Sequence, residues 1–172
     1  MDSQIDNEYF ERYKRHILVK NIGGQGQKKL GQAKVLLIGL GGIGSTVLQH
    51  LAAAGIGTIG IIDFDLVDET NLQRQVLYNM ANIGTLKTES AKEKILQLNP
   101  HIKVNTYNEG LTADNALSII SEYDVVLDGT DNFSSRYLVN DACVLLGKPN
   151  VYGSIYRFDG QISVFNHEGG PC

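Results

Sequence analysis

The most constraining feature of this sequence is a glycine-rich turn between a predicted strand and a predicted helix. Residues 34–39 form a continuous apolar run, which is typical of a strand buried on both faces of a parallel sheet. Gly39-Leu40-Gly41-Gly42-Ile43-Gly44 follows this run, and a helical pattern begins within it at residue 43. Glycines in this context let the backbone turn tightly and approach a phosphate, whose charge meets the free amides of the helix. The turn predicts a nucleotide site, although such glycines also serve close packing of helix and strand.

The rest of the chain alternates strand and helix patterns. Strands are predicted at residues 34–39, 58–63, 103–107, 125–128, 150–156 and 161–166, the last two joined by a turn at Phe158-Asp159-Gly160. Helices are predicted at residues 7–20, 25–30, 43–54, 87–98, 112–121 (capped by Thr112) and 132–146, and residues 65–83 as loop with short helical turns. We therefore expect an α/β fold with a doubly wound, Rossmann-like, mostly parallel sheet. An N-terminal helical segment (residues 1–33) precedes the nucleotide-binding domain (residues 34–172), which ends in an antiparallel strand addition.

Length and composition are those of one ordinary globular domain. The 172 residues are 42% hydrophobic and 20% charged. A net charge of −4 gives no electrostatic basis for binding nucleic acid or an anionic membrane. The apolar runs are too short to cross a bilayer, the N-terminus lacks a signal-peptide pattern, and two cysteines do not make a disulfide framework. We expect a cytoplasmic protein.

Charged side chains follow the second and fourth predicted strands. Asp63 ends the second strand, where a carboxylate accepts hydrogen bonds from ribose hydroxyls. Arg74 and Lys87 come next, and two cations suit an enzyme that stabilises charge on ATP phosphates better than one that transfers hydride. Asp131 follows the fourth strand at the carboxyl edge of the sheet, where a carboxylate close to phosphates would bind Mg²⁺. Taken singly, the two cations also fit solvated surface charges, and Asp131 a helix cap.

Together these stretches resemble the MoeB/ThiF/HesA family, the bacterial relatives of ubiquitin-activating enzymes. The resemblance runs from about residue 8 to Cys172, and residues 71–75 are its most specific part. The stretches that carry it are Arg12-Tyr13-Lys14-Arg15-His16-Ile17, Gly39–Gly44, Asp63-Phe64-Asp65, Asn71-Leu72-Gln73-Arg74-Gln75, Lys87, Asn99-Pro100 and Thr130-Asp131-Asn132.

The resemblance implies an adenylyltransferase that uses ATP and Mg²⁺. Its substrate would be the C-terminal carboxylate of a small ubiquitin-like, β-grasp sulfur-carrier protein ending in Gly-Gly, in molybdopterin or thiamin sulfur transfer. It implies catalytic roles for Arg15, Arg74, Lys87 and Asp131, with Asp131 as the Mg²⁺ ligand. The nucleotide-binding residues that it implies are Gly41, Gly42, Asp63, Thr70, Asn71, Leu72, Gln73, Arg74, Lys87, Asp131 and Asn132. Arg15 resembles the family arginine that reaches into the partner subunit's ATP site, which implies a homodimer.

The resemblance also implies a structural zinc site beyond this sequence. Family members carry two C-x-x-C pairs there, and Cys172 resembles the first cysteine of the first pair. One thiol cannot make a four-ligand site, so we expect a C-terminally truncated chain that does not bind zinc alone.

Two alternatives stay open. An NAD(P)-dependent oxidoreductase on the same fold would leave residues 71–75 unexplained. A truncated homologue that only binds its partner or nucleotide is disfavoured by the presence of Arg74, Lys87 and Asp131.

Overall fold

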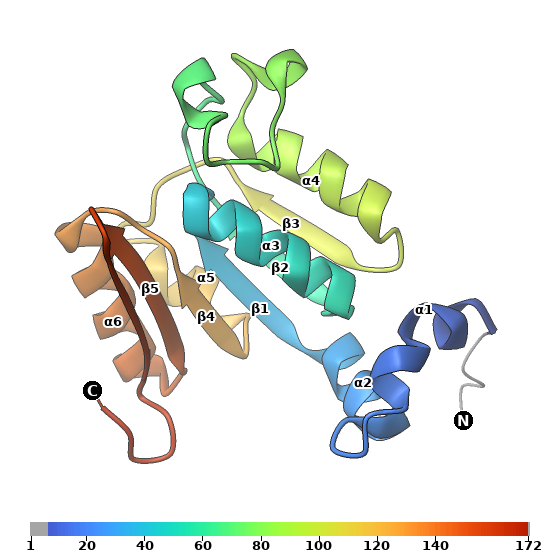
Figure 1. Cartoon of the computed structure of the whole chain (residues 1–172). Helices are drawn as coiled ribbons and strands as arrows, with labels where there is room; N and C mark the ends of the chain where they lie inside the picture. The colour runs from blue at the N-terminus through green and yellow to red at the C-terminus, as the bar shows by residue number, and fades with distance from the viewer. Residues whose placement is uncertain (1–6, 172) are drawn as a thin grey trace.

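The sheet of the computed structural model has six strands in the order β3-β2-β1-β4-β5-β6, and the structure describes residues 7–171 (Figure 1). The strands are β1 (Lys34–Ile38), β2 (Thr58–Ile62), β3 (Lys103–Tyr107), β4 (Val125–Asp128), β5 (Asn150–Tyr156) and β6 (Asp159–Phe165). The first five pair in parallel, and β6 is antiparallel to β5. The chain runs outward from β1 in both directions, which makes the carboxyl ends of β1 and β4 the switch point where ligands bind in such sheets. The prediction of a doubly wound, mostly parallel α/β fold is confirmed.

Helices cover both faces of this sheet. They are α1 (Asn7–Ile17), α2 (Gly23–Gln32), α3 (Gly42–Ala54), α4 (Lys87–Leu98), α5 (Ala116–Ser121) and α6 (Phe133–Leu146), with short 3₁₀ turns η1 (Glu69–Asn71) and η2 (Met80–Asn82). Leu37 belongs to the apolar cluster under α3 and α4, whereas Leu36 belongs to the cluster under α5 and α6. Successive side chains of a strand point to opposite faces, so a strand covered on both sides must be apolar throughout.

The N-terminal helices dock at the far end of the sheet from the switch point. Figure 1 shows α1 and α2 beyond the amino end of β1. Tyr13 of α1 is buried, and its hydroxyl accepts a hydrogen bond from Nδ2 of Asn99 at 2.7 Å. The same nitrogen donates to the carbonyl of Ala52 at 2.7 Å. One amide therefore joins α1 to the ends of α3 and α4.

Several predicted element ends were wrong. The first helix ends at Ile17, three residues early, and the second spans all of Gly23–Gln32. Helix α5 begins at Ala116, four residues later than predicted. Before it, Thr112 and Asn115 exchange reciprocal backbone-to-side-chain hydrogen bonds that close a turn. Strand β6 begins at Asp159, since the hairpin turns at residues 157 and 158 and Arg157 takes a positive φ of 56°. That conformation favours glycine, so the sequence predicts the turn at Gly160, whereas the structure has it at Arg157 and Phe158.

A close backbone approach joins the glycine turn to the first turn of α3. A Cβ atom on Gly44 would overlap the carbonyl oxygen of Gly39, whereas one on Gly41 would meet nothing within 4 Å. Gly44→Ala should therefore lower the free energy of unfolding by about 2 kcal/mol or more, the usual cost of overpacking, and Gly41→Ala by about 1 kcal/mol or less. Urea unfolding of the two variants measures the difference. Equal losses would contradict this account of the glycine turn.

Candidate functional site

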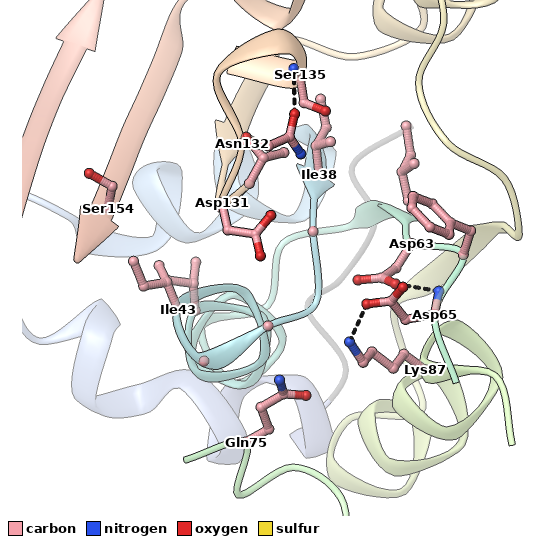
Figure 2. A pocket seen from close by; sticks show the side chains of 18 of the residues that line it. Ile38, Ile43, Asp63, Asp65, Gln75, Lys87, Asp131, Asn132, Ser135 and Ser154 are labelled. Carbon is pink, nitrogen blue, oxygen red and sulfur yellow. Dashed lines mark hydrogen bonds and ion pairs between the residues drawn. The ribbon is translucent and has the colours of Figure 1, made fainter. Parts of the chain in front are cut away.

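A cavity of about 810 Å³ opens at the carboxyl ends of β1, β2 and β4. It lies at the switch point of the sheet, where the topology places ligands, and its size suits a nucleotide-sized molecule. Six charged side chains contribute to its lining: Asp63, Asp65, Arg74, Lys87, Asp131 and Arg136. Figure 2 shows Asp131 on one side of the glycine turn and Asp63, Asp65 and Lys87 on the other.

The start of α3 forms one wall of the cavity. Its N-cap is Gly41, which has no side chain to accept from the first amides of the helix. Gly41 and Gly42 line the cavity, and a Cβ on Gly42 would lie 3.6 Å from the side chain of Arg74. Uncapped helix amides beside an arginine make a site for an anion such as a phosphate group.

Asp63 connects the glycine turn to the loop after β2. Its Oδ2 accepts from the backbone N–H of Leu40 at 2.7 Å, and its Oδ1 accepts from that of Asp65 at 2.8 Å. Burial raises the pKa of Asp63 above its ordinary value, although both hydrogen bonds and the nearby Lys87 charge oppose the shift. A carboxylate has about four acceptor positions, so Asp63 can still accept from ribose hydroxyls.

Lys87 is a buried cation at the start of α4. It is 5% exposed, and its Nζ lies 2.7 Å from Oδ2 of the half-exposed Asp65. The backbone N–H of Lys87 also donates to the carbonyl of Asp65 at 3.0 Å. The loop after β2 is thus tied to α4 twice through one aspartate.

The loop after β4 is clamped around Thr130. Oδ1 of the buried Asp128 accepts from both the backbone N–H and the hydroxyl of Thr130, at 2.9 and 2.7 Å. Arg136 donates to the Thr130 carbonyl from Nε and Nη2, at 3.3 and 3.1 Å, while its guanidinium lies 5.4 Å from the centres of the Phe133 and Tyr152 rings. Such cation–π contacts fix the guanidinium and, through Thr130, the residue that follows it.

The surroundings of Asp131 are those of a side chain that could bind a metal ion. Its carboxylate is exposed to the cavity, and nothing between residues 7 and 171 hydrogen-bonds to it. Its neighbour Asn132 is different, because its side chain caps α6 by accepting from the backbone N–H of Ser135 at 2.9 Å. A free carboxylate facing a phosphate-sized anion site is the kind of ligand that Mg²⁺ takes from proteins.

Eight of the predicted site residues line this one cavity: Gly41, Gly42, Asp63, Asn71, Arg74, Lys87, Asp131 and Asn132. Four do not. Thr70 bonds to Asp68, Leu72 packs against the core, and Gln73 and Arg15 are exposed elsewhere. The roles assigned to all twelve residues stay predictions.

Sequence reasoning passed over several residues that the fold brings to the cavity. Asp65, Gln75 and Arg136 are the important ones. Asp65 follows Asp63 by two residues and Arg136 follows Asn132 by one helical turn, so their spacing to predicted site residues was a usable signal. Gln75 belongs to the stretch 71–75 that carries the resemblance, but a glutamine gives no sign in the sequence that it will be buried at a site.

Within residues 7–171, no three histidine, cysteine, aspartate or glutamate side chains gather as a metal cluster. Cys172 lies outside the described residues, so the zinc expectation stays a prediction. None of the helices described is long and apolar enough to cross a membrane.

Comparisons with known proteins cover almost all of the chain. The ThiF family model matches residues 13–172. The probable adenylyltransferase/sulfurtransferase MoeZ of Mycobacterium tuberculosis is 54% identical over 163 residues, covering 95% of this chain and 42% of that protein. The sulfur carrier protein adenylyltransferase of Thermus thermophilus is 48% identical over 170 residues, covering 96% of this chain and 63% of that protein.

Solved structures agree with the sequence matches. The structure of E. coli tRNA N6-threonylcarbamoyladenosine dehydratase, TcdA, in complex with ATP has a TM-score of 0.82 and 29% identity, covering 88% of this chain and 63% of that chain. This chain thus spans 42% to 63% of these relatives. Because the family model matches from residue 13 to the last residue, on a sheet and glycine turn of the expected kind, the chain belongs to the ThiF family.

Proposed function

We propose that this chain carries the ATP site of an enzyme that adenylates the C-terminal Gly-Gly carboxylate of a small ubiquitin-like sulfur-carrier protein. The observation that carries the proposal is the convergence of Arg74, Lys87 and Asp131 around the uncapped start of α3. The names of the relatives from M. tuberculosis and T. thermophilus, and the ATP held by TcdA, support it.

The proposed arrangement assigns each part of the cavity to one part of ATP. The phosphates would lie at the start of α3, against Gly41 and Gly42, with Asn71, Arg74 and Lys87 as donors. Asp63 would accept from the ribose. Asp131 would hold Mg²⁺, which would neutralise charge on the phosphate oxygens.

The reaction needs positioning and electrostatic stabilisation more than proton transfer. A carboxylate oxygen of the carrier protein attacks the α-phosphorus, a new P–O bond forms, and the bond to the bridging oxygen of the β-phosphate breaks, releasing pyrophosphate. The nucleophile is already ionised, so no side chain has to remove a proton. Arg74 and Lys87 would stabilise the charge that builds up on the phosphate oxygens.

Cys143 is unsuited to a part in this chemistry. It is 1% exposed inside α6, and burial, reinforced by the charge of Asp128, raises the pKa of its thiol to about 12. A thiol of that pKa stays protonated near neutral pH and is a poor nucleophile.

The nucleotide itself separates adenylation from hydride transfer. ATP with Mg²⁺ should raise the melting temperature by about 5 °C or more at a hundred times its dissociation constant, because a ligand that binds only the folded state stabilises it by about 2.7 kcal/mol. NAD at the same concentration should have no effect. Differential scanning fluorimetry measures both, and stabilisation by NAD with ATP inert would favour the oxidoreductase instead.

The charged groups of the site should matter for the chemical step. We expect Asp131→Ala and Lys87→Ala each to slow carrier-dependent ATP–pyrophosphate exchange by about a hundredfold or more, as removal of an electrostatic group usually does. Asp114→Ala is a matched control, since Asp114 is exposed and outside the cavity. Exchange near the wild-type rate in either site variant would show that its role was misassigned.

We further propose that the working unit is a homodimer in which the residue 1–33 segment serves the partner's site. Arg15 is exposed on α1, and α1 lies beyond the amino end of β1 (Figure 1). The cavity lies at the opposite, carboxyl ends of the strands. Arg15 therefore cannot reach the cavity of its own chain without leaving α1. A guanidinium supplied by a second subunit stays charged and grips phosphate oxygens in a fixed fork.

Mixed dimers test this arrangement. Arg15→Ala and Asp131→Ala proteins should each be inactive, and subunit exchange between them should restore pyrophosphate exchange. One site of each mixed dimer would then combine an intact Asp131 with the partner's intact arginine. If activity stays absent although exchange is demonstrated by mass spectrometry, Arg15 does not act in trans.

A further inference from the structure

Gln75 is a buried polar side chain whose acceptor is unsatisfied. It is 2% exposed, and no partner within residues 7–171 hydrogen-bonds to its Oε1. Buried polar groups are nearly always paired, because an unpaired one loses its bonds to water and gains nothing in return. Gln27 shows the ordinary case, since its Oε1 meets His16 Nδ1 at 2.8 Å and its Nε2 donates to the carbonyl of Ala54 at 3.0 Å.

The position of Gln75 links this unpaired oxygen to the nucleotide site. Oxygens of Asp128 and Asn150 are also buried and have no hydrogen-bond partner in the described part of the chain, but of these three residues only Gln75 lines the cavity. Figure 2 shows its carboxamide beside α3, with the nitrogen toward the helix and the oxygen toward the side on which Lys87 lies. The free acceptor therefore lies at the end of the cavity where we place the phosphates.

The backbone around Gln75 holds the side chain in this place. The N–H of Gln75 donates to the carbonyl of Asn71 at 2.9 Å, and the N–H of Tyr78 donates to the carbonyl of Gln75 at 3.1 Å. Leu77 and Tyr78 are buried in the core cluster, and the Tyr78 hydroxyl donates to the Leu40 carbonyl at 3.2 Å. A residue anchored on both sides cannot turn its carboxamide out to solvent at low cost.

Within residues 7–171, Lys87 has unused hydrogen-bond donors, which complement the unused acceptor of Gln75. Its ammonium carries three donors, yet the one hydrogen bond it makes to the described part of the chain is to Asp65. Asp65 is half-exposed, whereas Lys87 is almost fully buried. Phosphates at the start of α3 would attract the ammonium and repel the Asp65 carboxylate, so their arrival weakens the one bond that Lys87 has.

We infer that Gln75 positions Lys87 on the nucleotide phosphates. When the ammonium turns from Asp65 toward the phosphates, Oε1 of Gln75 accepts one of its hydrogens and so fixes its direction. Gln75 is then a positioning residue, and its unpaired oxygen in the free protein is an acceptor kept for the bound state. The inference rests on the proposed function, because it requires phosphates in this cavity.

The test removes the acceptor with little change of volume. Gln75→Met and Gln75→Leu are both made, so that a folding defect in one leaves the other, and Gln97→Met is the control, since Gln97 lies on α4 with Lys87 but outside the cavity. Each protein is measured for its melting temperature without ligand and for its dissociation constant with Mg²⁺–ATP. Each is also combined with Lys87→Met.

We expect the Gln75 variants to melt without ligand at or above the wild-type temperature, because they lose a buried group that had no partner. Their dissociation constant for Mg²⁺–ATP should rise about tenfold, as expected for a lost hydrogen bond to a charged group, and Gln97→Met should change neither quantity. In the Lys87→Met background, the Gln75 substitution should add no further loss.

Other outcomes overturn the inference in distinguishable ways. Unchanged ATP affinity, with a lower melting temperature in the free protein, would show that Gln75 only packs. A tenfold loss that persists in the Lys87→Met background would mean that Gln75 contacts the nucleotide directly and does not act through Lys87. If the wild-type protein itself shows no binding of Mg²⁺–ATP, the proposed function fails and this inference fails with it.

Discussion

The site depends on the two hydrogen bonds that the Asp63 carboxylate accepts. Its two oxygens accept from Leu40 in the glycine turn and from Asp65 in the next loop, so one side chain joins the ends of β1 and β2. Asp65 in turn binds Lys87 through its side chain and its backbone. The glycine turn, the loop after β2 and the start of α4 are therefore linked in one chain of hydrogen bonds. The pKa of Asp63 is raised because this central position buries the carboxylate and removes it from water.

The long connection between β2 and α4 is ordered without regular secondary structure. Asp68 and Asn71 form a capping box at η1, and Asn79 and Asn82 form another at η2. Leu66 and Leu86 pair as an isolated antiparallel bridge, and Val67, Leu77 and Tyr78 are buried in the core. Local hydrogen bonds thus close the turns, and apolar side chains attach them to the domain. The loop thereby holds Asn71, Arg74 and Gln75 at the lining of the cavity.

The opposite side of the cavity is built in another way. There the loop after β4 is held by a buried carboxylate from inside the sheet, Asp128, and by the guanidinium of Arg136 from the first turns of α6. Both act on Thr130, and no hydrogen bond from the described residues, 7–171, reaches the Asp131 carboxylate. The hydrogen bonds to Thr130 hold the backbone next to Asp131 in place, while the oxygens of Asp131 stay available to a ligand.

The sequence by itself determined the strands, most of the helices and the identity of eight cavity residues. The buried strands are apolar throughout, and Gly55 and Gly147 end α3 and α6 in the left-handed conformation that glycine allows, so these elements carry their own signals. The start of α5 gave no such signal, because it follows a turn that side-chain hydrogen bonds between Thr112 and Asn115 close.

Only the tertiary structure decided which groups pair and which stay free. The order β2-β1-β4 brings residues 41, 63, 87 and 131 to one edge, although they are far apart along the chain. It also places α1, which carries Arg15, beyond the other end of the sheet and pairs Lys87 with Asp65. Gln75 is buried with an acceptor that nothing in residues 7–171 uses. Spacing along a sequence records the period of an element, but a hydrogen bond between elements depends on how they pack, and packing is a property of the whole fold.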